Sequence, residues 1–251
     1  MSARLPSASA YALAVDKEHR WLPVLAPQLP LPVPTPLGKG EPGAGYPHPW
    51  SVYTWLEGRT ASAEEIADPV RFAVALAGFL SALQGIDPTG GPTPGLHNWY
   101  RGGTLRTYDA QTRDALEALR SHVDVDLATE IWEHALTARW DGTEVWFHGD
   151  MARGNLLLEG GELAAVLDFG TCGVGDPACD MAVAWTLLTD AGREAFRDRL
   201  SVDAATWARG RGWALWKALV TCWRALGDDD EEVAAQLRVL DQILSDHLRD
   251  G

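Results

Sequence analysis

The sequence predicts an α+β fold, and three observations along the chain support this prediction. An aromatic and β-branched run at residues 50–56, WSVYTWL, is typical of a strand. Long stretches on either side of residues 145–167 carry apolar residues at helical spacing. Within 145–167, short apolar runs alternate with glycine, as in strands joined by tight turns. The 251 residues suffice for one large domain or two small lobes around a core.

The N-terminal part predicts a helix, an extended connection and a strand. Residues 8–24 have helical periodicity, which ends near Pro23. The prolines of residues 27–49 exclude a helix or a central strand. Leucine and valine alternate with these prolines, so we expect an ordered, extended connection leading into an edge strand. Residues 50–56 then predict a buried strand, followed by a turn at 57–58.

The remaining chain is expected to be mainly helical. Ser62 and Glu65 match a capping box, which predicts a helix over residues 62–86 that begins at Ser62. Residues 145–167 predict a strand, a loop and a hairpin with its turn at 159–161. Further helices are predicted near residues 109–122, near 127–139 and from 180 to the end.

Charge and hydropathy argue against several classes of partner. Lysine and arginine number 21 against 35 aspartate and glutamate, a formal net charge of −14. An acidic surface does not favour nucleic acid or anionic membranes, and it suits a cationic substrate. No stretch approaches the roughly 20 apolar residues of a membrane span, and the apolar run 10–15 is too short for a signal peptide. The three cysteines form no CxxC pair, which indicates reduced thiols, so we expect a cytoplasmic protein.

Residues 146–182 carry the candidate chemistry. Asp150 and Asn155 flank one short loop, and Asp168 follows the predicted hairpin. Phosphoryl transfer needs a carboxylate that faces the attacking hydroxyl, together with hard oxygen ligands that hold Mg²⁺ against nucleotide phosphates. The alternative is that Asp150 and Asp168 are ordinary exposed carboxylates on loops, but their joint spacing favours the catalytic interpretation.

The same passage resembles a known family. It contains HGDMARGN, LDFG and GDPACDMA in that order, and this order is similar to the catalytic loop and metal-binding segment of the aminoglycoside phosphotransferase family, which is related to protein kinases. Segments such as WSVYTWLEG and WARGRGWALWKAL resemble the family as well, so the resemblance covers nearly the whole chain. It implies a protein-kinase-like fold of two lobes. Residues 1–58 would form a truncated β-containing lobe and hinge, and 59–251 a mainly helical lobe with the catalytic loop.

The resemblance also implies roles for individual residues. Asp150 would be the catalytic base, and Asn155 and Asp168 would hold magnesium. The hinge backbone between Tyr53 and Trp55 would bind the adenine of ATP, with GTP as the other possible nucleotide.

Three further residues are interpreted as mainly structural, and the roles of two others stay open. We expect His148 to be an internal hydrogen-bonding residue, and Asp176 and Asp180 to brace the catalytic loop. For His97 and Asn98, substrate contact and loop bracing stay open.

The sequence departs from the family at its start. Relatives have two strands that cover the nucleotide phosphates, and a third strand whose lysine or arginine pairs with a helix glutamate. The residues at 4–6 resemble the end of that third strand, which makes Arg4 the candidate phosphate-binding cation and Glu18 its partner. The alternative for Arg4 is a frayed terminal residue. An open sheet edge would pair across a dimer, so a monomer and a homodimer both stay open.

The expected function is therefore a magnesium-dependent small-molecule kinase. It would transfer the γ-phosphate of ATP or GTP to a hydroxyl of an aminoglycoside-like or other small, cationic substrate. One alternative is a non-catalytic pseudokinase that binds a small molecule without nucleotide or magnesium. The other is a nucleotide-independent tailoring enzyme, in which Asp150 acts as a base without ATP. A hydrolase is poorly supported, because the sequence has no GxSxG motif.

Overall fold

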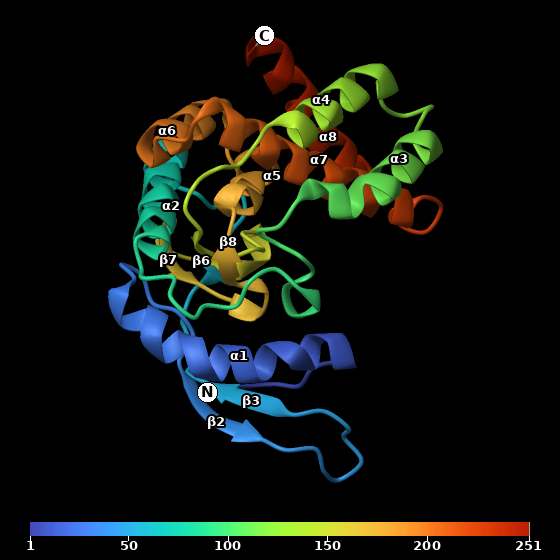
Figure 1. The fold of residues 1–251 in the computed structure, drawn as a ribbon. Coiled ribbons are helices and arrows are strands. Elements are labelled where there is room, and N and C mark those ends of the chain that lie inside the picture. Colours follow the sequence, from blue (N-terminus) through green and yellow to red (C-terminus); the bar gives the residue numbers. More distant parts are fainter. Residues whose placement is uncertain (251) are drawn as a thin grey trace.

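A small antiparallel sheet with one long helix packed on it forms the N-terminal part of the molecule (Figure 1). The computed structural model describes residues 1–250, and the strand order in this sheet is β1-β3-β2. The elements are β1 (Ser2–Arg4), α1 (Ser9–Leu25), β2 (Pro36–Gly40) and β3 (Trp50–Tyr53). α1 contacts β2 and β3. It also contacts two short 3-10 helices, Leu96–Asn98 and Phe169–Thr171, which belong to the larger, C-terminal part of the molecule.

The proline-rich segment is ordered and extended, as its sequence predicts. Val33 is buried in the core, and the segment leads into the edge strand β2. Pro36, which has no N–H to donate, occupies the first position of β2, next to an irregularity in the pairing with β3. β3 is shorter than the predicted run 50–56, because the chain leaves the sheet after Tyr53.

The larger part contains the remaining helices and two small sheets. The helices are α2 (Pro69–Gln84), α3 (Asp109–Ala118), α4 (Val125–Thr137), α5 (Val183–Thr186), α6 (Asp190–Leu200), α7 (Ala204–Ala225) and α8 (Asp230–Asp250). The strands are β4 (Arg59–Thr60), β5 (Val145–Phe147), β6 (Leu156–Glu159), β7 (Glu162–Val166) and β8 (Gly173–Gly175). β4, β6 and β7 form one antiparallel sheet, and β5 pairs with β8. The helices predicted after residue 100 are therefore confirmed, although α3 ends at Ala118 and α4 begins and ends two residues earlier than predicted.

The predicted hairpin is present as β6 and β7. Its turn consists of Gly160 and Gly161, whose φ angles are +61° and +83°. Two positive φ angles in a two-residue connection are favourable for glycine and match the twist of the flanking strands. The hairpin returns the chain toward the catalytic loop, because the N–H of Leu167 donates to the carbonyl of Asn155 at 2.7 Å.

The predicted start of the first helix in the larger part is wrong. α2 begins at Pro69, and its N-cap is Asp68, whose carboxylate accepts hydrogen bonds from the N–H groups of Val70 and Arg71, both at 3.0 Å. The N–H of Glu65 donates to the carbonyl of Ser62 in a separate turn. A cap followed directly by proline at the first helical position outcompetes the capping-box pattern further upstream.

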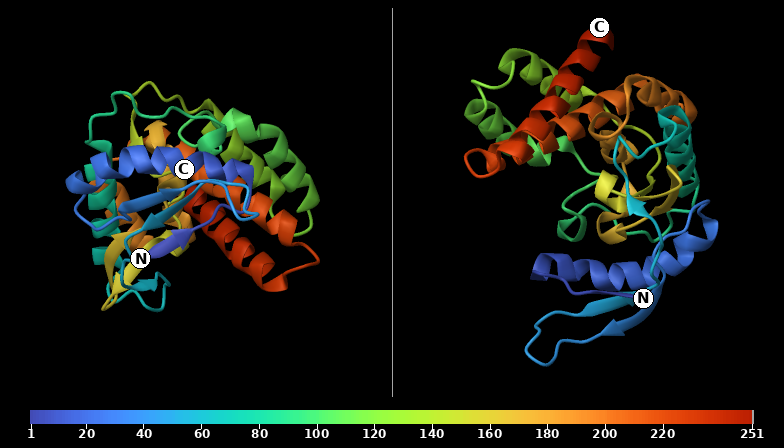
Figure 2. Two further views of the ribbon diagram at one scale, coloured as in Figure 1. Left: turned by 90° about the horizontal axis from the view of Figure 1, so that it is seen from below. Right: turned by 180° about the vertical axis from the view of Figure 1, so that it is seen from behind.

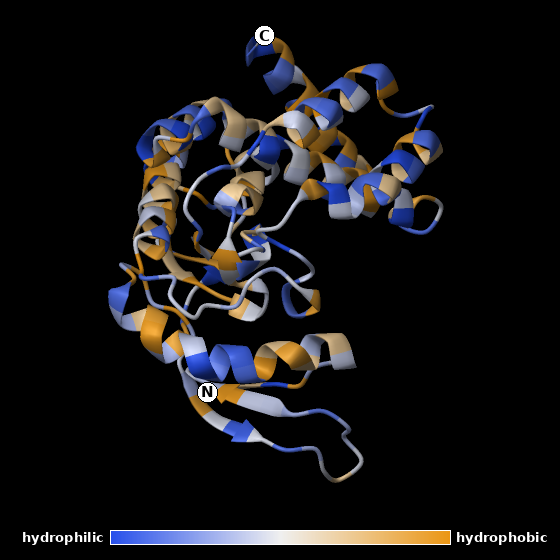
Figure 3. Ribbon diagram, in the orientation of Figure 1, coloured by the Kyte–Doolittle hydropathy of each residue, from blue (hydrophilic) through white to orange (hydrophobic). Residues whose placement is uncertain are grey.

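α7 is the central helix of the larger part and is buried along most of its length. It contacts α3, α4 and α8, together with the 3-10 helix Pro177–Ala182. Figure 2 shows that the N-terminal sheet lies at one end of the molecule and the C-terminal helices at the other. In Figure 3, α2 is hydrophobic over much of its length and α6 is mostly hydrophilic. No helix within residues 1–250 combines the length and the apolar character needed to cross a bilayer.

Candidate active site

The candidate catalytic loop, residues 148–155, is held in place by buried polar groups. The N–H groups of His148 and Gly149 donate to the two carboxylate oxygens of Asp180, at 2.8 and 2.7 Å. His148 is fully buried, and its Nε2 lies 2.8 Å from the carbonyl oxygen of Leu167. Burial raises the pKa of Asp180, and the two N–H donors oppose that effect. His148 is thus an internal hydrogen-bonding residue and Asp180 braces the loop, as the sequence predicts.

Asp176 anchors the following segment to α7. Its carboxylate accepts two hydrogen bonds from the guanidinium of Arg209, at 2.6 and 3.1 Å, and both side chains are buried. A bidentate pair of this kind fixes orientation as well as distance. Asp176 therefore anchors the segment after the loop to α7, and among the described residues it makes no hydrogen bond to the loop that it was predicted to brace.

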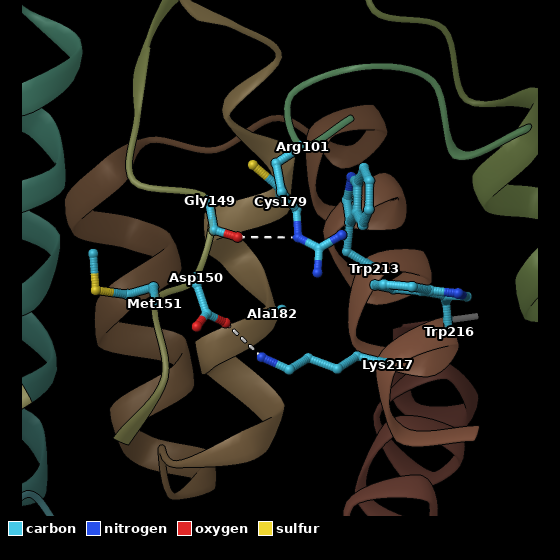
Figure 4. Close-up of a pocket in the computed structure, with 9 residues that line it drawn as sticks. All are labelled: Arg101, Gly149, Asp150, Met151, Cys179, Ala182, Trp213, Trp216 and Lys217. Atoms are coloured by element: carbon cyan, nitrogen blue, oxygen red, sulfur yellow. Dashed lines mark hydrogen bonds and ion pairs between the residues drawn. The ribbon is translucent and has the colours of Figure 1, made fainter. Parts of the chain in front are cut away.

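Asp150 emerges from this loop with a partner on each carboxylate oxygen. The Nζ of Lys217 lies 2.6 Å from Oδ1 (Figure 4). The amide Nδ2 of Asn155 lies 3.1 Å from Oδ2. Burial raises the pKa of Asp150, but the Lys217 ammonium outweighs it, and the pKa lies below its ordinary value. Asp150 is consequently ionised at neutral pH and able to accept a hydrogen bond from a hydroxyl group.

Asp168 lies in the left-handed region, with φ +60°, directly after the hairpin. Its Oδ1 accepts a hydrogen bond from the N–H of Gly170 at 3.2 Å, and its Oδ2 accepts one from Arg4 at 2.7 Å. The guanidinium of Arg4 also lies 3.7 Å from Oε1 of Glu18. The structure thus brings together three residues that are far apart in the sequence. Arg4 belongs to β1 and pairs with β3, so it is not frayed.

Asn155 and Asp168 have the chemistry that magnesium requires. The amide of Asn155 donates through Nδ2 to Asp150, and within residues 1–250 its Oδ1 has no hydrogen-bond donor. The carboxylate of Asp168 is half-buried and faces Arg4, as expected near phosphate groups. One neutral and one anionic oxygen are ligands that suit magnesium, which keeps water and phosphate oxygens as its other ligands.

The side chain of Glu18 is buried between α1 and the sheet. Its Oε2 accepts a hydrogen bond of 2.8 Å from the hydroxyl of Tyr53. Burial raises the pKa of Glu18, and Arg4 and Tyr53 counteract that rise. The Tyr53 side chain therefore orients Glu18, and only its main chain could contact a nucleotide.

Trp55 lies beyond β3 with 62% of its surface exposed. The N–H of Thr54 donates to the carbonyl of Thr35 at 3.0 Å. In the described part of the chain, the N–H of Trp55 has no acceptor. This backbone is accessible, and its contact with adenine stays a prediction.

Sequence reasoning missed two lysines. Lys17 is 8% exposed, and its Nζ donates to the carbonyls of Gly170 and Cys172, at 2.7 and 3.0 Å. Lys217 contacts Asp150 from α7. The only sign in the sequence that could have drawn attention to them is the rarity of lysine, because the chain contains just Lys17, Lys39 and Lys217.

The loop that precedes α3 supports the site from outside. Arg101 donates from Nε to the carbonyl of Gly149 at 3.1 Å, and its guanidinium stacks on Trp216 (Figure 4). His97 lies 3.1 Å from Nζ of Lys17, and the amide oxygen of Asn98 accepts the N–H of Gly95. These contacts give His97 and Asn98 a loop-bracing role.

Comparison with known proteins identifies the family of this chain. The sequence profile described as the phosphotransferase enzyme family matches residues 1–213. The chain belongs to that family. A search of curated protein sequences gave no match. The predicted resemblance is confirmed.

Solved structures of phosphotransferases share the fold. A GDP complex of an aminoglycoside 2'-phosphotransferase-IIIa variant has a TM-score of 0.71 and 16% identity, covering 98% of this chain and 85% of that one. A ternary complex of APH(2″)-IIa with streptomycin and ATP has a TM-score of 0.62 and 15% identity, covering 96% of this chain and 84% of that one. The apoenzyme of the macrolide 2'-phosphotransferase MphH from Brachybacterium faecium has a TM-score of 0.58 and 20% identity, covering 95% of this chain and 83% of that one. The predicted α+β, kinase-like fold is therefore confirmed.

Proposed function

We propose that this phosphotransferase transfers the γ-phosphate of ATP or GTP to a hydroxyl of a small molecule. The observation that carries the proposal is the convergence of Asp150, Asn155 and Asp168, joined by the bonds Asn155–Asp150 and Leu167–Asn155. Asp150 would accept the proton of the hydroxyl as the phosphoryl group moves to its oxygen. Phosphoryl transfer depends mainly on positioning and charge neutralisation, which this arrangement can supply.

Asn155 and Asp168 would hold Mg²⁺, which supplies charge neutralisation at the nucleotide phosphates. Arg4 would contact the phosphates, oriented by Glu18. The main chain between Tyr53 and Trp55 would bind the base of the nucleotide. Support for these roles comes from the ion pairs of Arg4 with Glu18 and Asp168.

We place the acceptor in a groove of about 450 Å³ beside Lys217. This volume lies within the range of about 300–1,000 Å³ usual for small-molecule sites. Two carboxylates, Glu64 and Glu232, line the groove and would bind amino groups of an aminoglycoside-like or other cationic acceptor. Arg153, Lys217 and Arg238 line it as well, so the lining has three cations against two carboxylates, which argues against a polycationic acceptor.

The acidic net charge of −14 supports a protein without nucleic-acid or membrane partners. We propose a cytoplasmic location and either a monomer or a homodimer.

Calorimetric titration with ATP and GTP, each with and without Mg²⁺, tests the nucleotide site. Asp168→Asn is the variant of choice, because asparagine tolerates the positive φ while the charge is lost. We expect magnesium-dependent binding to wild type, weakened at least about 10-fold in Asp168→Asn. Asp241→Asn on the exposed face of α8 is the matched control and should bind as wild type does.

Absence of nucleotide binding at high protein concentration would overturn the proposal. Small-molecule binding without nucleotide or magnesium would then favour a pseudokinase. Turnover of a substrate without ATP would instead favour a tailoring enzyme in which Asp150 acts as a base.

A further inference from the structure

Lys217 reaches the candidate base from α7. Its Nζ lies 2.6 Å from Oδ1 of Asp150 (Figure 4). A second cation near the loop, Arg101, binds the Gly149 carbonyl and stacks on Trp216, and it makes no hydrogen bond to the Asp150 carboxylate. Lys217 is therefore the cation that directly contacts the Asp150 carboxylate in the described residues.

The fold gains little stability from this contact. The side chain of Lys217 is 41% exposed and that of Asp150 is 36% exposed. Ion pairs this accessible contribute little, because solvent screens them and holding a long side chain in place costs entropy. A flexible ammonium on a candidate catalytic carboxylate therefore indicates a role in the reaction.

The position of Lys217 fits such a role. Its side chain lines both the small pocket that contains Asp150 and the larger groove proposed for the acceptor. Both oxygens of Asp150 already have partners, Lys217 on Oδ1 and Asn155 on Oδ2. A hydroxyl group that binds Asp150 must therefore share an oxygen with one of them or displace it. Asn155 is also held by a hydrogen bond to the main-chain carbonyl of Asp150, whereas Lys217 lies at the end of a flexible stem and its side chain is 41% exposed. Lys217 is therefore the partner that can move.

We propose that Lys217 is a further catalytic residue, which leaves Asp150 and binds the γ-phosphate oxygens when the nucleoside triphosphate is in place. The inference rests on the proposed function. In the transfer, the acceptor oxygen forms a bond to the γ-phosphorus, and the bond from that phosphorus to the β,γ-bridging oxygen breaks. The hydroxyl proton passes to Asp150, and the nucleoside diphosphate leaves. Lys217 stays protonated throughout and neutralises charge on the phosphoryl group.

The scarcity of lysine makes this movement measurable in the unmodified protein. Growth on lysine labelled with ¹³C at Cε gives one resonance each for Lys17, Lys39 and Lys217. Lys39→Arg and Lys217→Arg assign two of them. With the magnesium complex of the non-hydrolysable analogue AMP-PNP (GMP-PNP if calorimetry selects GTP), we expect the Lys217 resonance to shift. The corresponding diphosphate, which has no γ-phosphate, should leave it in place. The Lys39 resonance should not respond to either.

The outcomes separate this inference from the proposed function. If calorimetry shows saturation and the Lys217 resonance stays in place with the triphosphate analogue, the inference is wrong and the nucleotide site stands. An equal shift with the diphosphate would also overturn it, because a general conformational effect explains that result. If neither nucleotide binds, the proposed function fails, and this inference fails with it.

Kinetics provide the second measurement. With an acceptor in hand, we expect Lys217→Met to lower kcat by about 10²-fold, as for other deleted charge-stabilising donors. Diphosphate affinity should stay within about 2-fold of wild type, and Lys217→Arg should recover most of the rate. A structural brace would instead give losses in nucleotide affinity and thermal stability that Lys39→Met does not show.

Discussion

Lys17 is the residue that ties α1 to the segment carrying Asp168. Its ammonium is nearly inaccessible and donates to the carbonyls of Gly170 and Cys172. Burial lowers the pKa of Lys17, and nearby acidic groups, Glu18 among them, partly oppose this. The contact keeps the N-terminal part, with Arg4 and Glu18, in place beside Asp168.

Replacing Lys17 by methionine should therefore affect both stability and nucleotide binding. The apolar stem is retained, but two buried carbonyls lose their donor, which should cost about 1–3 kcal/mol in the free energy of unfolding. Magnesium-nucleotide affinity should fall as well, because the segment after Asp168 loosens. Urea denaturation and calorimetry measure the two effects. Lys39→Met, which removes a partly exposed lysine paired with Asp16, should change the stability by less than about 0.5 kcal/mol.

At the residue scale, the sequence predicted those site residues that lie close together along the chain. Asp150, Asn155 and Asp168 were predictable because one loop and one hairpin connect them, and a hairpin returns the chain by simple geometry. Lys17 and Lys217 were not predictable, because helices distant in the sequence deliver them and only tertiary packing brings the helices there. Scarcity of lysine marked them without indicating a partner.

At the scale of elements, periodicity predicted that the helices exist, while caps determined where they begin. Asp68→Ala removes the N-cap of α2 and should lower the free energy of unfolding by about 1 kcal/mol. Ser62→Ala should change it by less than about 0.5 kcal/mol, because the Ser62 side chain caps no helix. Thermal denaturation of both variants tests the corrected boundary, and equal losses would contradict it.

The glycines of two helices should respond to alanine in opposite directions. A Cβ at Gly212 in α7 would lie 2.5 Å from Cβ of Ala135 and 2.9 Å from Cδ1 of Leu105. Gly212→Ala should therefore destabilise the protein by about 1–3 kcal/mol, because α4 and α7 cannot separate freely.

Gly78 in α2 is the matched control for this prediction. A Cβ there meets nothing within 4 Å. Gly78→Ala should stabilise the protein by about 0.5–1 kcal/mol through its higher helix propensity. Chemical denaturation of the two variants gives the comparison, and stabilisation by Gly212→Ala would show that α7 packs less closely against α4.

At the scale of the whole molecule, a buried ionic network joins the C-terminal helix α8 to the helices α5, α6 and α7. Asp246 of α8 accepts hydrogen bonds from Arg211 at 2.9 Å, from Arg193 at 3.3 Å and from Trp185 at 2.9 Å. Arg211 also pairs with Asp250. Residue 246 therefore joins α5, α6, α7 and α8 at one point. Helical periodicity predicts α8 but not the partners of its polar side.

The Asp246 network should make stability depend on pH. Burial raises the pKa of Asp246, but hydrogen bonds from Arg211 and Trp185 and the charges of the arginines outweigh it, so the pKa lies below its ordinary value of 3.8. The unfolded chain then binds a proton at higher pH than the folded chain does. The contribution of the Asp246 charge to the free energy of unfolding is therefore complete above about pH 5, and it is lost as the pH falls through the pKa of Asp246 in the folded protein.

Asp246→Asn should accordingly lower the free energy of unfolding by about 2–4 kcal/mol at pH 7, because Arg193 and Arg211 lose their shared buried partner. The difference from wild type should shrink as the pH falls below about 4, because protonation removes the same charge from the wild-type side chain. Urea denaturation at pH 7, 5, 4 and 3 measures both effects. Asp241→Asn, exposed on the same helix, should follow wild type at every pH. A loss for Asp246→Asn that is equal at all four pH values would mean that its hydrogen-bonding shape, and not its charge, holds α8 in place.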